Sequence, residues 1–281
     1  MNANLKQYND ICFELSKKIT ESYSTSFTHG IKTLGQKYHM PIFAIYGFVR
    51  LADEIVDSFH EFNKAELLKD FVAQTYKAIE DKISTNTVLH AFQLIVNEYN
   101  IERELIDAFL LSMEMDLDKK VYNKELYTKY IYGSAEVVGL MCLHVFVSGN
   151  VNEYQRLREP ARKLGAAFQK VNFLRDMKSD FADRGRVYFP SVDFAVFDDN
   201  AKKAIEADID ADFAEAYHGI MQLPEDVRPG VYTAYIYYLE LLKKIKGVSA
   251  SEVLKKRFRI ADSMKFLLLL RTHARFKMGI S

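Results

Sequence analysis

The stretch Gln169-Lys-Val-Asn-Phe-Leu-Arg-Asp-Met-Lys-Ser-Asp180 decides how this chain is interpreted. Its polar residues Gln169, Asn172, Asp176 and Asp180 recur at offsets of three, four and four. This spacing places them within roughly 80° of arc on one side of a helix, with apolar residues on the other. A plain surface helix has no need of amides in register with its carboxylates, so the pattern predicts a polar seam that lines a cleft.

A second stretch, Asp53-Glu-Ile-Val-Asp57, repeats the four-residue spacing and continues a stripe that begins at Tyr46 and Arg50. Two helices facing each other with such carboxylates would form an oxygen-rich pocket of the kind that Mg²⁺ prefers. We therefore predict a metal site that binds a diphosphate, built from both stretches. The predicted metal ligands are Asp53, Asp57, Asp176 and Asp180.

The same spacing also occurs at Asp208 and Asp212, where the surrounding sequence is acidic and contains no arginine. This pair predicts a solvated helix face rather than a site. Spacing alone is therefore a weak signal, and the neighbouring amide and basic residues distinguish the two candidate stretches from this one.

Composition excludes several classes of protein. The 38 Lys and Arg residues balance the 38 Asp and Glu residues, so the net charge is zero. It gives no reason to expect a protein that binds the phosphate backbone of nucleic acids. The two cysteines, Cys12 and Cys142, lack the spacing of a zinc site and predict no disulfide framework. We expect a cytoplasmic protein, because the first ten residues carry charges where an export signal would be apolar.

No apolar run approaches the roughly 20 residues that cross a bilayer, so we expect no transmembrane segment. Peripheral association with the inner face of the membrane stays open as an expectation.

The chain predicts an all-α fold, because it contains only five prolines and 12 glycines and its apolar periodicity is helical nearly throughout. With 49% hydrophobic residues and no linker or repeat, residues 1–281 are predicted to form one domain. Pro160 should mark a kink or the first turn of a helix. The predicted helices span residues 4–20, 23–35, 40–58, 62–82, 87–98, 101–118, 125–148, 152–181, 198–220, 224–246 and 251–276.

The segment after the second acidic stretch, residues 181–190, combines Gly185 and Pro190 with Arg184, Arg186 and Tyr188. Glycine and proline end the helical pattern, while two arginines beside a candidate metal site predict contact with a diphosphate. We interpret this segment as a lid or mouth rather than a plain surface turn.

These motifs resemble the squalene/phytoene synthase family, most closely the bacterial phytoene synthases, over nearly the whole chain. The most specific block joins Gln169–Asp180 to Arg184-Gly-Arg-Val-Tyr-Phe-Pro190. Three shorter blocks support it: Ser24-Thr-Ser-Phe27, Ala44-Ile-Tyr-Gly-Phe-Val-Arg-Leu-Ala-Asp-Glu-Ile-Val-Asp57, and Ala135-Glu-Val-Val-Gly139. The resemblance implies a helical bundle of the isoprenoid-synthase type around a central hydrophobic cavity.

The resemblance also implies roles for individual residues. The four aspartates would hold Mg²⁺, with Mn²⁺ as an alternative, and the metal would bridge the diphosphates. The residues implied near the diphosphates or reacting carbons are Tyr46, Arg50, Arg175 and Tyr238. The residues implied to bind substrate are Ser26, Phe27, Gln169, Asn172, Arg186, Tyr188 and Arg257.

The chain departs from the family pattern at Thr25, where many relatives carry a basic residue, so one diphosphate contact is in doubt. The first acidic stretch reads Asp53-Glu54 rather than two aspartates, and the second has Lys178-Ser179 where an acid is common. Neither change removes one of the four bracketing aspartates.

The expected reaction is the head-to-head condensation of two geranylgeranyl diphosphates to phytoene through a cyclopropyl diphosphate, in carotenoid biosynthesis. One alternative is a squalene or dehydrosqualene synthase that uses farnesyl diphosphate, with NADPH needed only for the squalene type. Terpene cyclisation and head-to-tail elongation share acidic motifs, but the Gln169–Pro190 block argues against them. A non-catalytic helical assembly factor is the alternative from another class.

Overall fold

The computed structural model describes the backbone of residues 3–118, 122–184, 188–190 and 197–278, and their side chains except those of 118 and 179–184. Every regular element in this part of the chain is a helix, which confirms the all-α prediction. The single-domain assignment to residues 1–281 stays a prediction.

The helices are α1 (Ala3–Tyr23), α2 (Thr25–Thr33), η1 (Gln36–Tyr38), α3 (His39–Asp57), α4 (Lys64–Asp81), α5 (Thr87–Tyr99), α6 (Arg103–Asp118), α7 (Lys124–Ile131), η2 (Tyr132–Glu136), α8 (Val137–Phe146), α9 (Val151–Arg184), α10 (Asp199–Ile220), α11 (Arg228–Lys246), α12 (Ala250–Val253) and α13 (Asp262–Lys277).

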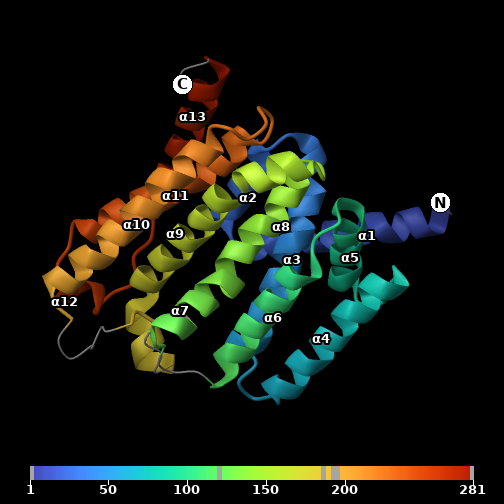
Figure 1. The fold of residues 1–281 in the computed structure, drawn as a ribbon, viewed down its shortest axis with the longest axis horizontal. Coiled ribbons are helices and arrows are strands. Elements are labelled where there is room, and N and C mark those ends of the chain that lie inside the picture. Colours follow the sequence, from blue (N-terminus) through green and yellow to red (C-terminus); the bar gives the residue numbers. More distant parts are fainter. Residues whose placement is uncertain (1–2, 119–121, 185–187, 191–196, 279–281) are drawn as a thin grey trace.

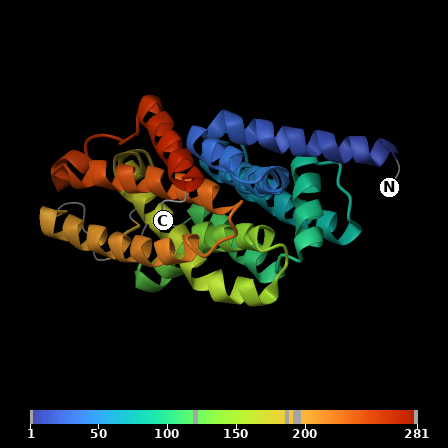
Figure 2. The same cartoon turned by 90° about the horizontal axis from the view of Figure 1, so that it is seen from above.

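The helices form an elongated bundle in which early and late parts of the chain occupy opposite ends. Figures 1 and 2 show α1, α4 and α5 toward one end, α10 to α12 toward the other, and α3, α8 and α9 between them. The packing of α1 on α3, of α9 on α8 and α10, and of α11 on α2 joins these groups. The middle helices α3 and α9, which carry the acidic stretches, therefore both lie in the interior of the bundle, and both pack on α8.

Short polar residues begin several of these helices. The side-chain oxygens of Asn63, Asn86, Asn123 and Asp198 accept hydrogen bonds from the first free backbone N–H groups of α4, α5, α7 and α10. Each such cap stabilises the folded protein by about 1 kcal/mol relative to an uncapped helix. These caps explain why the predicted starts of these helices agree with the structure within about two residues.

Two predicted helices differ from the structure. The predicted helix 251–276 is wrong as one element, because residues 254–261 are not helical and separate α12 from α13. In this connection Phe258 is buried and Arg257 forms an ion pair with Asp176. In an uninterrupted helix these two side chains would point in other directions. The predicted helix 125–148 contains a wide π-helical turn, η2, between α7 and α8.

Glycine permits the close approach of η2 to α6. A Cβ atom on Gly133 would lie 2.4 Å from the backbone oxygen of Ala108, so no larger residue fits without displacing a helix. Wide turns of this kind inside helices often occur at functional sites. Here the turn directs Ser134 and Ala135 toward an internal cavity.

Pro160 lies inside α9, which is continuous from Val151 to Arg184. Of the two predicted alternatives, the first turn of a helix is therefore wrong, and a kink stays a prediction. The ring of Pro160 packs closely against α10, where a Cβ atom on Gly219 would lie 2.2 Å from the Pro160 Cβ. The seam from Gln169 onward therefore belongs to one long helix held against α10.

Candidate active site

An internal cavity of about 330 Å³ lies between α2, α3, α8, α9, α10 and α11. Along α3 the apolar Ile42 and Ile45 precede Arg50 and Asp53, and along α9 Leu157 likewise precedes the seam. The cavity therefore has an apolar end and a polar end. The predicted site residues that line it are Phe27, Tyr46, Arg50, Asp53, Gln169, Asn172 and Tyr238.

On the α3 side, Arg50 and Asp53 face the cavity one turn apart. Arg50 forms an ion pair with Glu54, and its guanidinium lies 4.2 Å from the centre of the Tyr23 ring. Its buried Nε has no hydrogen-bond partner among the described residues. A buried donor without a partner is costly, so Arg50 is suited to bind an anion in the cavity.

The Asp53 carboxylate lies in a setting that disfavours its charge. Burial raises its pKa to about 7, and the negative charges of Asp57 and Asp116 act in the same direction while Arg50 opposes them. Nearby Tyr46 also has its pKa raised by burial, to about 12, so its hydroxyl stays protonated. Oxygen donors with an excess of negative charge are the kind of site that a hard divalent cation stabilises.

On the α9 and α11 side, amides and hydroxyls form a connected chain. Gln169 donates to the Ser134 hydroxyl at 3.2 Å, and Asn172 donates to the Gln169 side-chain oxygen at 3.4 Å. The Tyr238 hydroxyl donates to the Asn172 side-chain oxygen at 3.3 Å. These bonds fix the orientation of the seam that the sequence predicted on α9.

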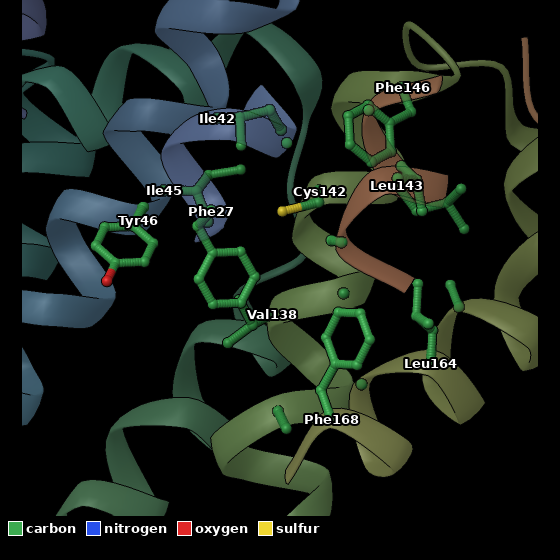
Figure 3. A pocket seen from close by; sticks show the side chains of 18 of the residues that line it. Phe27, Ile42, Ile45, Tyr46, Val138, Cys142, Leu143, Phe146, Leu164 and Phe168 are labelled. Atoms are coloured by element: carbon green, nitrogen blue, oxygen red, sulfur yellow. The ribbon is translucent and has the colours of Figure 1, made fainter. Parts of the chain in front are cut away.

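Aromatic rings line the cavity next to these polar groups. Phe168 and Tyr238 stack with ring centres 4.0 Å apart, and Phe27 lies 5.7 Å from Tyr46 and 6.2 Å from Tyr238. Figure 3 shows Phe27 between Tyr46 and Phe168, with its ring directed into the cavity. Ring faces in this position can stabilise a carbocation by roughly 0.5 to 2 kcal/mol each.

The second acidic stretch lies beside this wall. Asp176 accepts hydrogen bonds from Arg175 Nε at 3.1 Å and forms an ion pair with Arg257 at 2.6 Å. Burial is the main cause that raises the pKa of Tyr238. The charge of Asp176 also raises it, and the charge of Arg175 lowers it. The structure thus joins Arg257 to the predicted site through Asp176.

The oxygen donors of Asp53 and Asn172 are of the kind that Mg²⁺ prefers. The Asp53 carboxylate is buried with the negative charge of Asp57 beside it, and the Asn172 amide lies on the opposite wall. Among the side chains that the structure describes, no three His, Cys, Asp or Glu groups are placed to hold one ion together. The side chain of Asp180 is outside the described residues, and the metal site stays a prediction.

Three predicted substrate-binding residues in the described part of the chain do not line the cavity. Arg257 pairs with Asp176. Ser26 is partly buried on α2. Tyr188 is buried and stacks on Phe173 with ring centres 4.0 Å apart, in a cluster with Tyr130. It therefore packs behind α9 rather than at an open mouth. Arg186, with the lid predicted around it, lies outside the described residues.

The sequence-based prediction missed three residues near the site. Asp116 on α6 is buried, acts electrostatically on Asp53 and accepts a hydrogen bond from Tyr130 at 2.7 Å. The only sequence feature that could have indicated Asp116 is a carboxylate within a largely apolar helical stretch. Cys142, for which the sequence predicted no site, lines the cavity, and Figure 3 shows its sulfur directed inward.

The third is Lys265 on α13, whose ammonium group donates to the Thr25 hydroxyl at 2.6 Å. The two residues are separated by most of the chain, so no local pattern could indicate the contact. A cation thus reaches the position at which the chain lacks the basic residue of the family pattern.

No helix in the described part of the chain is long and apolar enough to span a membrane.

Comparisons with known proteins agree with this geometry. The family model for squalene/phytoene synthase matches residues 20–263. The chain is 26% identical to a phytoene synthase of Arthrospira platensis over 266 residues, covering 83% of this chain and 84% of that protein. It is 24% identical to a 4,4'-diapophytoene synthase of Staphylococcus haemolyticus over 202 residues, covering 70% and 68%.

Among solved structures, a dehydrosqualene synthase in complex with a ligand superposes with a TM-score of 0.80 at 22% identity, covering 97% of this chain and 99% of that one. This similarity establishes the shared fold. Because the family model spans most of the chain, the chain belongs to the squalene/phytoene synthase family and is a phytoene synthase-like prenyltransferase.

Proposed function

We propose that the protein condenses two isoprenoid diphosphates head to head, and that its substrate is geranylgeranyl diphosphate and its product phytoene. The observation that carries this proposal is the cavity itself, in which Arg50, Asp53, Asn172 and Tyr238 gather at one end of an otherwise apolar chamber. A diphosphate fits the polar end, and a prenyl chain fits the apolar end. The phytoene synthases among the similar proteins support the same product.

The chemistry begins when a diphosphate leaves the first substrate and an allylic cation remains. Arg50 can bind the departing phosphate oxygens, because its Nε is buried and lacks a partner among the described residues. A bound Mg²⁺, held by Asp53, Asp57, Asp176 and Asp180, would supply Lewis-acid stabilisation of the leaving group. Mn²⁺ is the alternative metal.

The double bond of the second substrate then attacks the cation, a proton is lost, and a cyclopropyl diphosphate forms. Loss of its diphosphate, rearrangement and a second proton loss give the hydrocarbon. The apolar walls, including Phe27 and Phe168, would exclude water that could capture either cation. The proposed phytoene reaction needs no reductant, so NADPH belongs only to the squalene alternative.

The direct experiment incubates the pure protein with geranylgeranyl diphosphate and Mg²⁺ and analyses the extracted hydrocarbons. We expect a C40 product with the mass and spectrum of phytoene. A C30 product from farnesyl diphosphate alone would replace phytoene by squalene or dehydrosqualene, and a dependence on NADPH would distinguish those two. The absence of hydrocarbon from either diphosphate would favour a non-catalytic assembly factor.

The diapophytoene synthase among the similar proteins is the specific reason to keep a shorter substrate as the second candidate. Carotenoid biosynthesis is the setting that the phytoene proposal implies. Peripheral association with a membrane stays a prediction at this point, because nothing in the cavity bears on it.

A further inference from the structure

The segment 257–265, which leads from α12 into the first turn of α13, runs from one wall of the cavity to another. At its start Arg257 forms an ion pair with Asp176 of α9 at 2.6 Å. At its end the Lys265 ammonium donates a hydrogen bond to the Thr25 hydroxyl of α2 at 2.6 Å. Both α9 and α2 line the cavity, so this segment borders its polar end and places a cation at each side.

Two hydrogen bonds from α11 hold the segment in place. The Lys244 ammonium donates to the backbone oxygen of Arg259 at 2.8 Å, and the Tyr237 hydroxyl donates to the backbone oxygen of Lys265 at 2.7 Å. Tyr237 is buried and directly precedes Tyr238, which forms part of the cavity wall. The backbone of Lys265 is therefore fixed to a helix of the site.

The positive charge of Lys265 is poorly neutralised for a group with little access to water. Its side chain is 15% exposed, whereas its ion-pair partner Asp262, at 3.1 Å, is 83% exposed. A carboxylate so well hydrated attracts a cation only weakly. The pKa of His29 is lowered, first by burial and then by the charge of Lys265, so this neighbour stays neutral near pH 7. An ammonium group in such a setting is stabilised by an anion bound beside it.

Thr25 lies at the start of α2, next to residues that belong to the cavity. The preceding Ser24 is hydrogen-bonded through its side chain to Tyr46, and Phe27 lines the cavity. Thr25 itself is exposed to solvent. The Lys265 ammonium therefore lies at the rim of the cavity, on its α2 side.

The proposed reaction needs two places that bind a diphosphate, and these places have different tasks. The donor substrate loses its diphosphate, which calls for a metal ion and for the polar groups around Arg50 and Asp53. The acceptor substrate attacks the resulting cation through its double bond, loses one proton and keeps its diphosphate in the cyclopropyl product. A retained diphosphate is held rather than expelled, so a flexible ammonium group at the rim is suited to it.

We infer, on the basis of that proposed function, that Lys265 binds the diphosphate of the acceptor substrate during the first condensation. Its ammonium group, on a flexible four-carbon stem, can exchange the Thr25 hydroxyl for phosphate oxygens at the rim. The acceptor chain then runs past Phe27 into the apolar end of the cavity. The two diphosphates are thereby kept apart, one beside the aspartates and one at the rim.

Binding of inorganic pyrophosphate tests the site without any prenyl substrate. Isothermal titration calorimetry in a chelator leaves the aspartates without metal, so cationic side chains dominate the measured affinity. Lys265→Gln keeps a hydrogen-bond donor but removes the charge, and we expect at least about tenfold weaker binding. Lys265→Arg keeps the charge and should bind within about threefold of wild type. The matched control Lys256→Gln removes the same charge from a lysine that pairs with Glu252 at the surface, and it should bind like wild type.

A structural role, in which Lys265 only holds α13 on α2, is separated by two further variants. Thr25→Val removes the hydrogen bond but keeps the charge, so pyrophosphate binding should change less than about twofold. Thr25→Lys/Lys265→Met moves the charge across the contact and leaves no hydrogen bond there, yet it should restore the binding that Lys265→Met loses. Equal losses in Thr25→Val and Lys265→Gln, without rescue by the double variant, would overturn the inference.

Kinetics with geranylgeranyl diphosphate and Mg²⁺ give a second test. A retained diphosphate is bound alike in the ground state and the transition state, so its loss should appear mainly in KM. We expect Lys265→Gln to raise KM at least about tenfold with a smaller fall in kcat, whereas loss of a metal ligand should lower kcat. A fall in kcat at unchanged KM would contradict the assignment to the acceptor.

These measurements also distinguish this inference from the proposed reaction. Pyrophosphate binding that depends on Lys265, in a protein that forms no hydrocarbon, would refute the reaction and leave the anion site in place. Hydrocarbon formation with pyrophosphate affinity and KM both unaffected by Lys265→Gln would overturn the inference alone.

Discussion

The Tyr238 hydroxyl on α11 donates a hydrogen bond to the side-chain oxygen of Asn172 on α9 across the wall of the cavity, at 3.3 Å. This bond ties the polar seam of α9 to the aromatic wall, since the same tyrosine stacks on Phe168. It fixes which way the Asn172 amide points, and therefore which group it offers to the cavity.

Replacing Tyr238 by phenylalanine should keep the aromatic stack and remove the hydroxyl, which bonds to Asn172 and also interacts with Arg175. We expect kcat/KM to fall by about 5- to 10-fold, as for the loss of hydrogen bonds that position a site. Steady-state kinetics with the diphosphate substrate measure the change. Tyr235→Phe, at a buried tyrosine of the same helix that packs on Phe213, should leave kcat/KM unchanged. Equal effects of the two variants would contradict a positioning role.

Replacing Asp53 or Asp176 by alanine should lower turnover by at least about 1,000-fold, because the leaving diphosphate would lose bound positive charge. Circular dichroism should show the helical content of wild type. Asp208→Asn is the control, since Asp208 has the same spacing to a second aspartate but pairs with Lys170 between α9 and α10. Near-normal turnover in Asp53→Ala or Asp176→Ala would refute the metal assignment.

The stability of the metal-free protein should depend on the titration of Asp53. Burial raises the pKa of Asp53 to about 7 in the folded protein, above the value of about 3.9 for an unfolded aspartate. Protonated Asp53 therefore contributes stability that is complete below about pH 4 and lost as the pH rises through about 7. Urea unfolding in a chelator should show wild type losing stability relative to Asp53→Asn between pH 5 and 8.

Mg²⁺ should restore stability to wild type at the alkaline end of this range and act less on Asp53→Asn, because a cation stabilises the charged carboxylate. A difference between the two proteins that stays constant with pH would argue against this account of Asp53.

The position of Cys142 predicts a control over substrate length. In Figure 3 its sulfur points into the cavity, toward the apolar side chains Ile42 and Ile45 of α3. Cys142→Phe should fill this space and lower turnover of the C20 diphosphate more than tenfold, with a smaller loss for the C15 substrate. Cys142→Ser, which keeps the volume, is the control. Equal losses for both substrates would place Cys142 outside the chain-binding region.

Gly165 should be intolerant of even one added carbon. A Cβ atom there would lie 2.6 Å from the backbone oxygen of Ala135, so Gly165→Ala would push α9 away from η2. We expect a loss of about 1 to 3 kcal/mol in the free energy of unfolding. Gly247→Ala is the matched control, since its Cβ would have only ordinary contacts at 3.6 Å. Denaturant unfolding compares the two, and equal stabilities would contradict the close packing.

The helices and the polar seam were predictable from sequence because both depend on local spacing. A period of 3.6 residues determines that Gln169 and Asn172 share one side of a helix, whatever that helix packs against. The capping residues and the few breakers set most boundaries in the same local way. The interruption between α12 and α13 was not predicted. Its residues make contacts with distant parts of the chain, such as Arg257 with Asp176, which no local pattern indicates.

The sequence by itself thus determined the helical class, the side of each helix that is polar and the family to which the motifs belong. Only tertiary structure decided that Asp116 lies near Asp53, that Lys265 reaches Thr25 and that Tyr188 packs away from the cavity. Periodicity specifies the direction of a side chain relative to its own helix. Its neighbour across the cavity depends on how helices far apart in the chain pack together.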